Sequence, residues 1–184
     1  MTYEEQRDLL TRARQAIEGC RPCGTYKPAV GFRPQYFSQN EDTYRVLDEL
    51  GLAYNSGFKA RELYAEGHAD DAAPYPIEGH RFMAVPISTV SRGDRRVYLC
   101  DIACANVEGR TGRQFADALG EGLDAAAAAG EPLVILVHGY HTGDASKDYW
   151  TPFVEFLDEV AARAETLTTA ELVERYATSD AGGG

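Results

Sequence analysis

Apolar residues recur along this chain either at helical spacing or in short uninterrupted runs. The first helical pattern comprises Leu9, Leu10, Ala13, Ala16 and Ile17. Positions three and four apart share one face of a helix, so this pattern predicts an amphipathic helix. Thr2 and Glu5 have the spacing of a capping box, and Gly19 is a suitable end. We therefore expect a helix that begins after Thr2 and ends near Gly19.

Four further segments are predicted to be helical. The second helix is expected to start at Asn40, which can cap it, and to close at Gly51. Its inward face would consist of Tyr44, Val46, Leu47 and Leu50. The other three helices are expected at residues 111–129, 149–164 and 168–176, the last capped by Thr168.

The short apolar runs predict strands, which alternate with these helices. The expected strands are residues 29–32, 52–54, 82–87, a hairpin of 87–90 and 97–99, 132–137 and 166–167. Between them, residues 66–81 are rich in Gly, Pro, Asp and His and predict a long loop. The alternation predicts an α/β protein with a largely parallel sheet or barrel segment. We expect one domain over residues 1–177 and a flexible tail over 178–184.

One of these runs ends on a histidine. Residues 133–137 are all aliphatic, without polar alternation, which predicts a strand buried on both faces. His138 follows directly, at the carboxyl end of that strand, where α/β sheets and barrels usually carry their chemistry. His138 is therefore the first candidate for a functional residue.

A second candidate is Arg33, which precedes a proline at the end of the 29–32 run. Pro34 favours an extended conformation of Arg33, which would aim its guanidinium over the rim of the sheet. A guanidinium in that place can orient a carboxylate through two hydrogen bonds. A surface arginine in a turn is the alternative.

Composition and charge exclude several classes of protein. The chain has 184 residues, 44% of them hydrophobic, which is ordinary for one globular domain. Its net charge of −11 argues against a nucleic-acid partner, because phosphate contacts need a basic surface. Neither an apolar stretch of membrane-spanning length nor a signal-peptide pattern is found in the sequence. We expect a cytoplasmic protein that binds neither nucleic acid nor membrane.

Several of these segments, taken in order, resemble the polysaccharide deacetylase family, the NodB-type carbohydrate esterases. The segment Arg33-Pro34-Gln35-Tyr36 resembles the family's Arg-x-Pro-Tyr motif, with Gln35 as a modest departure. The run that ends on His138 resembles the family's last motif. Three more segments fit the family's order, namely residues 40–51, 53–56 and 166–171. The resemblance extends from about Tyr3 to Tyr176.

The resemblance implies a fold and a reaction. The fold would be the later part of a NodB-type (β/α) barrel without its first strands. The reaction would be metal-dependent hydrolysis of acetyl groups from acetylated carbohydrate, with a divalent metal such as zinc polarising the carbonyl and activating water. His138 would be the general acid, Arg33 would orient the catalytic base, and Tyr36 and Tyr140 would contact the substrate.

Two motifs of the family do not occur in this sequence. They are Thr-Phe-Asp-Asp-Gly, which supplies the base and one metal ligand, and His-x-x-x-His, which supplies the other two ligands. We therefore expect this chain alone to bind no metal and to be inactive. Three alternatives remain: an upstream segment carries the missing half-barrel, a separate chain supplies it, or the chain is a non-catalytic carbohydrate-binding or interaction module.

Substitute sites are weaker hypotheses. A metal site of His138, His141 and Asp144 is disfavoured, because spacing in a loop fixes no coordination geometry. A four-cysteine zinc site would use Cys20, Cys23, Cys100 and Cys104, but reduced thiols are the default in a cytosolic chain. An aromatic cluster of Tyr140, Tyr149 and Trp150 could stack on a sugar or simply cover the core.

Overall fold

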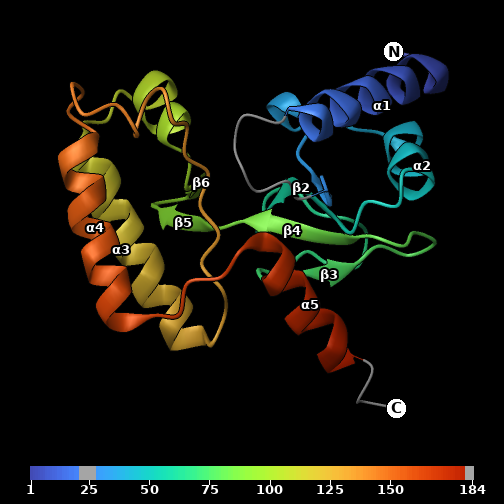
Figure 1. Ribbon diagram of the computed structural model, residues 1–184. Coiled ribbons are helices and arrows are strands. Elements are labelled where there is room, and N and C mark those ends of the chain that lie inside the picture. Colours follow the sequence, from blue (N-terminus) through green and yellow to red (C-terminus); the bar gives the residue numbers. More distant parts are fainter. Residues whose placement is uncertain (21–27, 181–184) are drawn as a thin grey trace. The chain divides into compact units, whose positions relative to one another are not determined.

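The computed structural model describes residues 1–20 and 28–180, which form two compact units (Figure 1). The first unit runs to Phe58 and also contains Pro74–Val85 and the chain from Thr168. The second unit consists of Lys59–Ala73 and Pro86–Leu167. No helix of the described residues is long and apolar enough to cross a membrane.

The first unit combines three helices with most of a four-stranded sheet. The helices are α1 (Tyr3–Gly19), α2 (Glu41–Glu49) and α5 (Thr169–Asp180). The strands lie in the order β1 (Gly31–Phe32), β2 (Tyr54–Lys59), β4 (Met83–Ile87) and β3 (Tyr75–Pro76). β1 and β2 are parallel, whereas β3 and β4 are antiparallel.

Side-chain caps set where these helices begin. Thr2 accepts a hydrogen bond from the backbone N–H of Glu5, and the Glu5 carboxylate accepts one from the N–H of Thr2. Asn40 and Thr43 cap α2 in the same reciprocal way. Each pair satisfies backbone donors that the first helical turn leaves unpaired, so the expected starts of both helices are confirmed.

The second unit packs two helices side by side next to a hairpin. α3 (Gly112–Ala129) and α4 (Trp150–Arg163) run along one another, and β5 (Thr89–Arg92) pairs with β6 (Arg95–Tyr98) (Figure 1). Gly122 lets α3 approach the segment after β6, because a Cβ there would lie 2.7 Å from a methyl carbon of Leu99. The core of this unit comprises Val90, Val97, Leu99, Cys104, Phe115, Ala118, Leu119, Leu123, Tyr149 and Phe156.

The α/β class is confirmed, but several local expectations are wrong. β2 begins at Tyr54 rather than at residue 52, and β3 lies within the expected loop 66–81. Residues 132–137 do not form the expected strand buried on both faces: their hydrogen bonds to Ser88, Leu99 and Asp101 make a single isolated bridge, between Leu136 and Cys100, and Val137 is exposed. Residues 166–167 are a linker between α4 and α5, not a strand. α5 ends at Asp180 rather than at residue 176, and residues 181–184 lie outside the described residues.

The two sheets within the described residues are open. The strand order therefore does not show a closed barrel. The described residues form a mixed α/β arrangement with one four-stranded and one two-stranded sheet. The half-barrel that the resemblance implies remains a prediction, as does the domain boundary after residue 177.

Candidate functional site

The candidate site lies in the second unit, where two neighbouring segments end. The chain leaving β6 runs parallel to residues 132–137, with Cys100 bridged to Leu136. The N–H of Leu136 donates to the carbonyl of Leu99 at 2.9 Å, and the N–H of Asp101 donates to the carbonyl of Leu136 at 3.2 Å. Parallel pairing brings the ends of both segments to the same edge. Asp101 and His138 are therefore neighbours, although they are 37 positions apart.

The carboxylate of Asp101 is fully buried and accepts hydrogen bonds on both oxygens. Oδ1 accepts from the His138 ring at Nδ1, at 2.6 Å, and from the N–H of Ile102, at 2.8 Å. Oδ2 accepts from the N–H of His138 at 2.8 Å and from the hydroxyl of Thr142 at 2.6 Å. Four donors around one buried carboxylate compensate for the water that it has lost.

These contacts decide the charge of Asp101. Burial raises the pKa of the carboxyl, but the hydrogen bonds from Thr142 and His138 more than offset burial, and the pKa of Asp101 lies below its ordinary value of 3.8. Asp101 is therefore ionised at neutral pH. An ionised carboxylate only accepts hydrogen bonds, so Nδ1 of His138 carries the proton in their contact.

His138 combines an anchored ring nitrogen with a partly exposed ring. Its side chain is 31% exposed, whereas that of Asp101 is 0% exposed. With Nδ1 bound to Asp101, Nε2 is the ring nitrogen that can exchange a proton with a substrate. The ring centroids of Tyr140 and His138 lie 5.5 Å apart, and Tyr140 is 69% exposed. A ligand at this edge could contact both rings.

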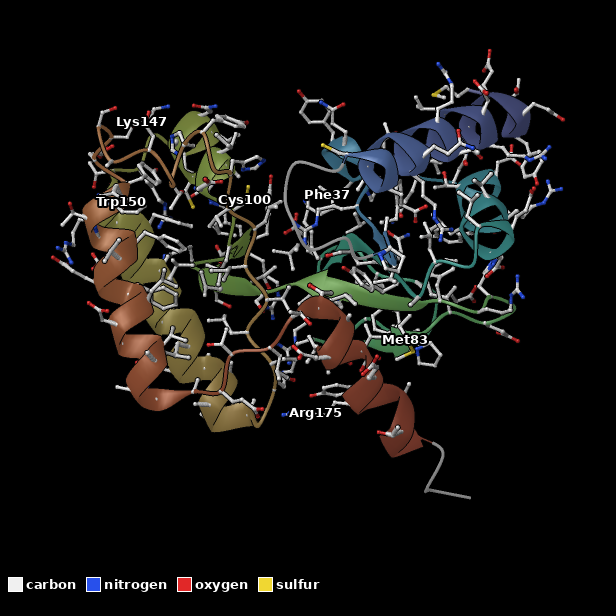
Figure 2. The ribbon with its side chains drawn as sticks, in the orientation of Figure 1. Phe37, Met83, Cys100, Lys147, Trp150 and Arg175 are labelled. Atoms are coloured by element: carbon white, nitrogen blue, oxygen red, sulfur yellow. The ribbon has the colours of Figure 1, made fainter. Side chains whose placement is uncertain are left out.

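A tight turn after His138 gathers the other groups around Asp101. The N–H groups of His141 and Thr142 both donate to the carbonyl of His138, at 2.9 and 3.0 Å. Gly143 closes the turn, because a Cβ there would lie 2.6 Å from the carbonyl oxygen of Gly139. The loop then continues through Lys147 to Trp150, both labelled in Figure 2.

Within the described residues, one group of three side chains offers donors that could hold a metal ion. Cys100 Sγ, an oxygen of Asp101 and a ring nitrogen of His138 lie within 4.8 Å of one another. Two ligands of one tetrahedral zinc ion lie roughly 3.3 Å apart, given zinc–ligand bonds of about 2.0–2.1 Å. Oδ1 of Asp101 and Nδ1 of His138, at 2.6 Å, instead share a proton. As arranged, these donors do not fit a tetrahedral zinc ion.

The other two expected site residues belong to the first unit. The guanidinium of Arg33 donates to the hydroxyl of Ser56 at 2.9 Å, which in turn donates to the carbonyl of Val85 at 3.1 Å. Tyr36 is 90% exposed and, with Phe37, has a left-handed backbone, with φ of 53° and 57°. Two consecutive non-glycine residues in this region are strained. The roles of Arg33 and Tyr36 stay predictions.

The three aromatic residues that could stack on a sugar differ in their burial. Tyr149 is buried in the core, and its hydroxyl donates to the carbonyl of Arg110 at 2.7 Å. Trp150 is 38% exposed and Tyr140 more so. Tyr149 is therefore a core residue, and Tyr140 and Trp150 remain candidates for contact with a sugar.

The cysteines also differ in their burial and in the unit to which they belong. Cys100 and Cys104 are buried in the second unit (Cys100 is labelled in Figure 2), and Cys20 is exposed in the first. Cys23 lies outside the described residues. Burial, with a contribution from Glu108, raises the pKa of the Cys104 thiol to about 11.

The carboxylate that matters most was missed by reasoning from sequence. Asp144 was considered as a neighbour of His138, but its carboxylate accepts from the N–H and the hydroxyl of Ser146. Asp101 takes that place instead. A signal was present, since Asp101 follows the apolar residues Val97–Cys100 as His138 follows its own apolar run.

Comparisons with known proteins bear on the fold. No family model matches the chain, and no curated protein matches it. A crystal structure described as a "putative polysaccharide deacetylase from Mycobacterium smegmatis" is similar, with a TM-score of 0.72 and 20% sequence identity. The likeness covers 97% of this chain and 58% of that one, so the chain spans little more than half the length of its structural neighbour. The chain thus has a polysaccharide deacetylase-like fold.

Proposed function

We propose that this chain carries the proton-donating side of a deacetylase-like hydrolase that acts on acetylated carbohydrate. The observation that carries the proposal is the contact between buried Asp101 and the Nδ1–H of His138, at 2.6 Å, together with the 31% exposure of the His138 side chain. The likeness in fold to the Mycobacterium smegmatis protein supports the choice of reaction.

In the proposed reaction, His138 donates a proton from Nε2 to the amine or alcohol that leaves when the acetyl group is cleaved. Asp101 holds the ring in the tautomer with Nδ1 protonated and stabilises the imidazolium before transfer. Tyr140 would contact the sugar, and the roles that the resemblance gives to Arg33 and Tyr36 stay predictions. A divalent metal, held by an upstream segment or a partner chain that also supplies the base, would polarise the acetyl carbonyl. A cytoplasmic location stays a prediction.

Acetate release from N-acetylated chitooligosaccharide tests this proposal. The chain would be assayed alone and together with a protein segment that carries the Asp-Asp-Gly and His-x-x-x-His motifs, with zinc present. We expect release only in the mixture, and we expect His138→Gln to lower it roughly 100-fold or more, the usual share of general acid catalysis. The matched control is Asp144→Asn, which leaves the rate unchanged. Equal rates for His138→Gln and the unmodified chain would refute the proposal.

A non-catalytic carbohydrate-binding module is the second candidate. It is favoured by the exposed rings of Tyr140 and Trp150, since exposed aromatic rings can stack on sugars. Calorimetry with the same oligosaccharide separates the two functions. Binding that is lost in Tyr140→Ala but kept in His138→Gln, without acetate release in any mixture, would support the binding module.

A further inference from the structure

One carboxylate faces two imidazoles, and it bonds to only one of them. Asp101 accepts the Nδ1–H of His138 at 2.6 Å, whereas Nδ1 of His141 stops 3.6 Å from Oδ2 of the same carboxylate. That separation is too long for a hydrogen bond. Nδ1 of His141 is buried and has no hydrogen-bond partner within the described residues. Leaving it unpaired is costly, so something must keep the ring from closing the gap.

Thr142 occupies the place that His141 would take. Its hydroxyl donates to Oδ2 of Asp101 at 2.6 Å, and the N–H of His138 donates to the same oxygen at 2.8 Å. A carboxylate oxygen offers about two lone pairs in its plane, and these two donors fill them. Thr142 is buried, so its hydroxyl does not exchange this bond for one to water.

The neighbouring groups do not compete for Oδ2. The thiol of Cys100 lies 4.0 Å from Oδ1, on the other oxygen of Asp101. The ring of Tyr149 stands edge-on to that of His141, with centroids 4.4 Å apart, and its hydroxyl is bonded to Arg110. The Thr142 hydroxyl is thus the side-chain donor that separates His141 from the carboxylate.

We propose that Thr142 is a positioning residue that reserves Asp101 for His138 and withholds it from His141. This proposal rests on the proposed function. If Thr142 acts in this way, the site has one oriented proton donor, His138, instead of two imidazoles that share Asp101 as a counter-ion. His138 acquires a fixed tautomer, whereas His141 stays unpaired. Thr142 acts through Asp101 and need not touch the substrate.

NMR spectroscopy of the full chain labelled with 15N-histidine tests the proposal without any activity assay. Ring N–H protons bonded to a carboxylate are protected from exchange and strongly shifted downfield. His68 and His80 also place Nδ1 against carboxylates, at 2.6 Å from Asp71 and 2.8 Å from Asp48, so their signals are first assigned with His68→Gln and His80→Gln. Apart from these two, we expect one such Nδ1 proton in the unmodified chain, from His138. Thr142→Val has the same shape without the hydroxyl, and we expect it to show a second bonded proton from His141. That second signal should vanish in Thr142→Val/His141→Gln, and Thr142→Ser should restore the single signal.

Each result decides the matter. A bonded His141 proton in the unmodified chain or in Thr142→Ser would overturn the proposal, and so would a folded Thr142→Val variant that shows no bonded proton from His141. If Thr142→Val fails to fold by circular dichroism, Thr142→Ala provides the same loss of the hydroxyl with more space. Acetate release plays no part in these spectra, so a failure of the proposed function would be recognised separately.

Discussion

Gly112 and Asp148 are in direct backbone contact at the start of α3. The N–H of Gly112 donates to the Asp148 carboxylate at 2.9 Å, and a Cβ on Gly112 would lie 2.2 Å from the backbone oxygen of Asp148. The loop that begins at His138 is thus fixed at its far end to the first turn of a core helix. The site therefore depends on a close approach that only glycine permits.

Gly112→Ala is expected to destabilise the protein by roughly 1–3 kcal/mol, the usual cost of overpacking, because the contact is with rigid backbone. Gly120 lies in the same helix, and a Cβ there would meet nothing within 4 Å. Gly120→Ala should therefore stabilise α3 by about 0.5–1 kcal/mol through helix propensity alone. Urea unfolding of the two variants measures both effects. Similar changes in the same direction would contradict the contact.

Asp101→Asn keeps the shape of the side chain and removes its charge. The NH2 group of the asparagine would face donors whose hydrogen bonds the carboxylate now accepts. We therefore expect a loss of about 2–4 kcal/mol in the free energy of unfolding. Asp117→Asn, on the exposed face of α3, is the matched control and should change stability by less than about 0.5 kcal/mol. Equal midpoints in urea for both variants would show that Asp101 is not a structural anion.

The lowered pKa of Asp101 predicts a pH dependence with a definite sign. Since the carboxyl is more acidic in the folded protein than in the unfolded chain, its contribution to stability is complete above the ordinary value of 3.8 and is lost as the pH falls through the folded value. The unmodified protein should therefore lose more stability between about pH 5 and pH 3 than Asp101→Asn does. Parallel urea curves over that range would argue against this assignment.

The capping pairs show how far sequence reasoning reaches. The spacing of Thr2 and Glu5, and Asn40 as a capping residue, are local signals, so the sequence alone locates both helix starts. The burial of the apolar run 133–137 was predicted wrongly. Hydrophobicity indicates that a segment is buried against other residues, but it does not show whether one face or both faces are covered. Asp101 was missed for a related reason: its role arises from the parallel pairing of its neighbour Cys100 with Leu136, 36 residues further along the chain.

The thiol of Cys104 should be chemically inert in the folded protein. Its pKa of about 11, raised by burial, leaves almost no thiolate at pH 8. Iodoacetamide followed by peptide mapping should label exposed Cys20 within minutes and Cys104 only after unfolding in urea. Labelling of both at the same rate would mean that the core around Cys104 opens readily.

The turn from His138 to Gly143 makes the site more sensitive to the length of this segment than to the residue at its tip. Its backbone bonds return to His138 within a few residues, and Gly143 lies against Gly139 with no room for a side chain. Tyr140, at its exposed tip, can be exchanged without disturbing the turn. One inserted residue would instead shift His141 and Thr142 together away from Asp101. Among divergent forms of this protein, the spacing between these residues should therefore vary less than the residue at the tip.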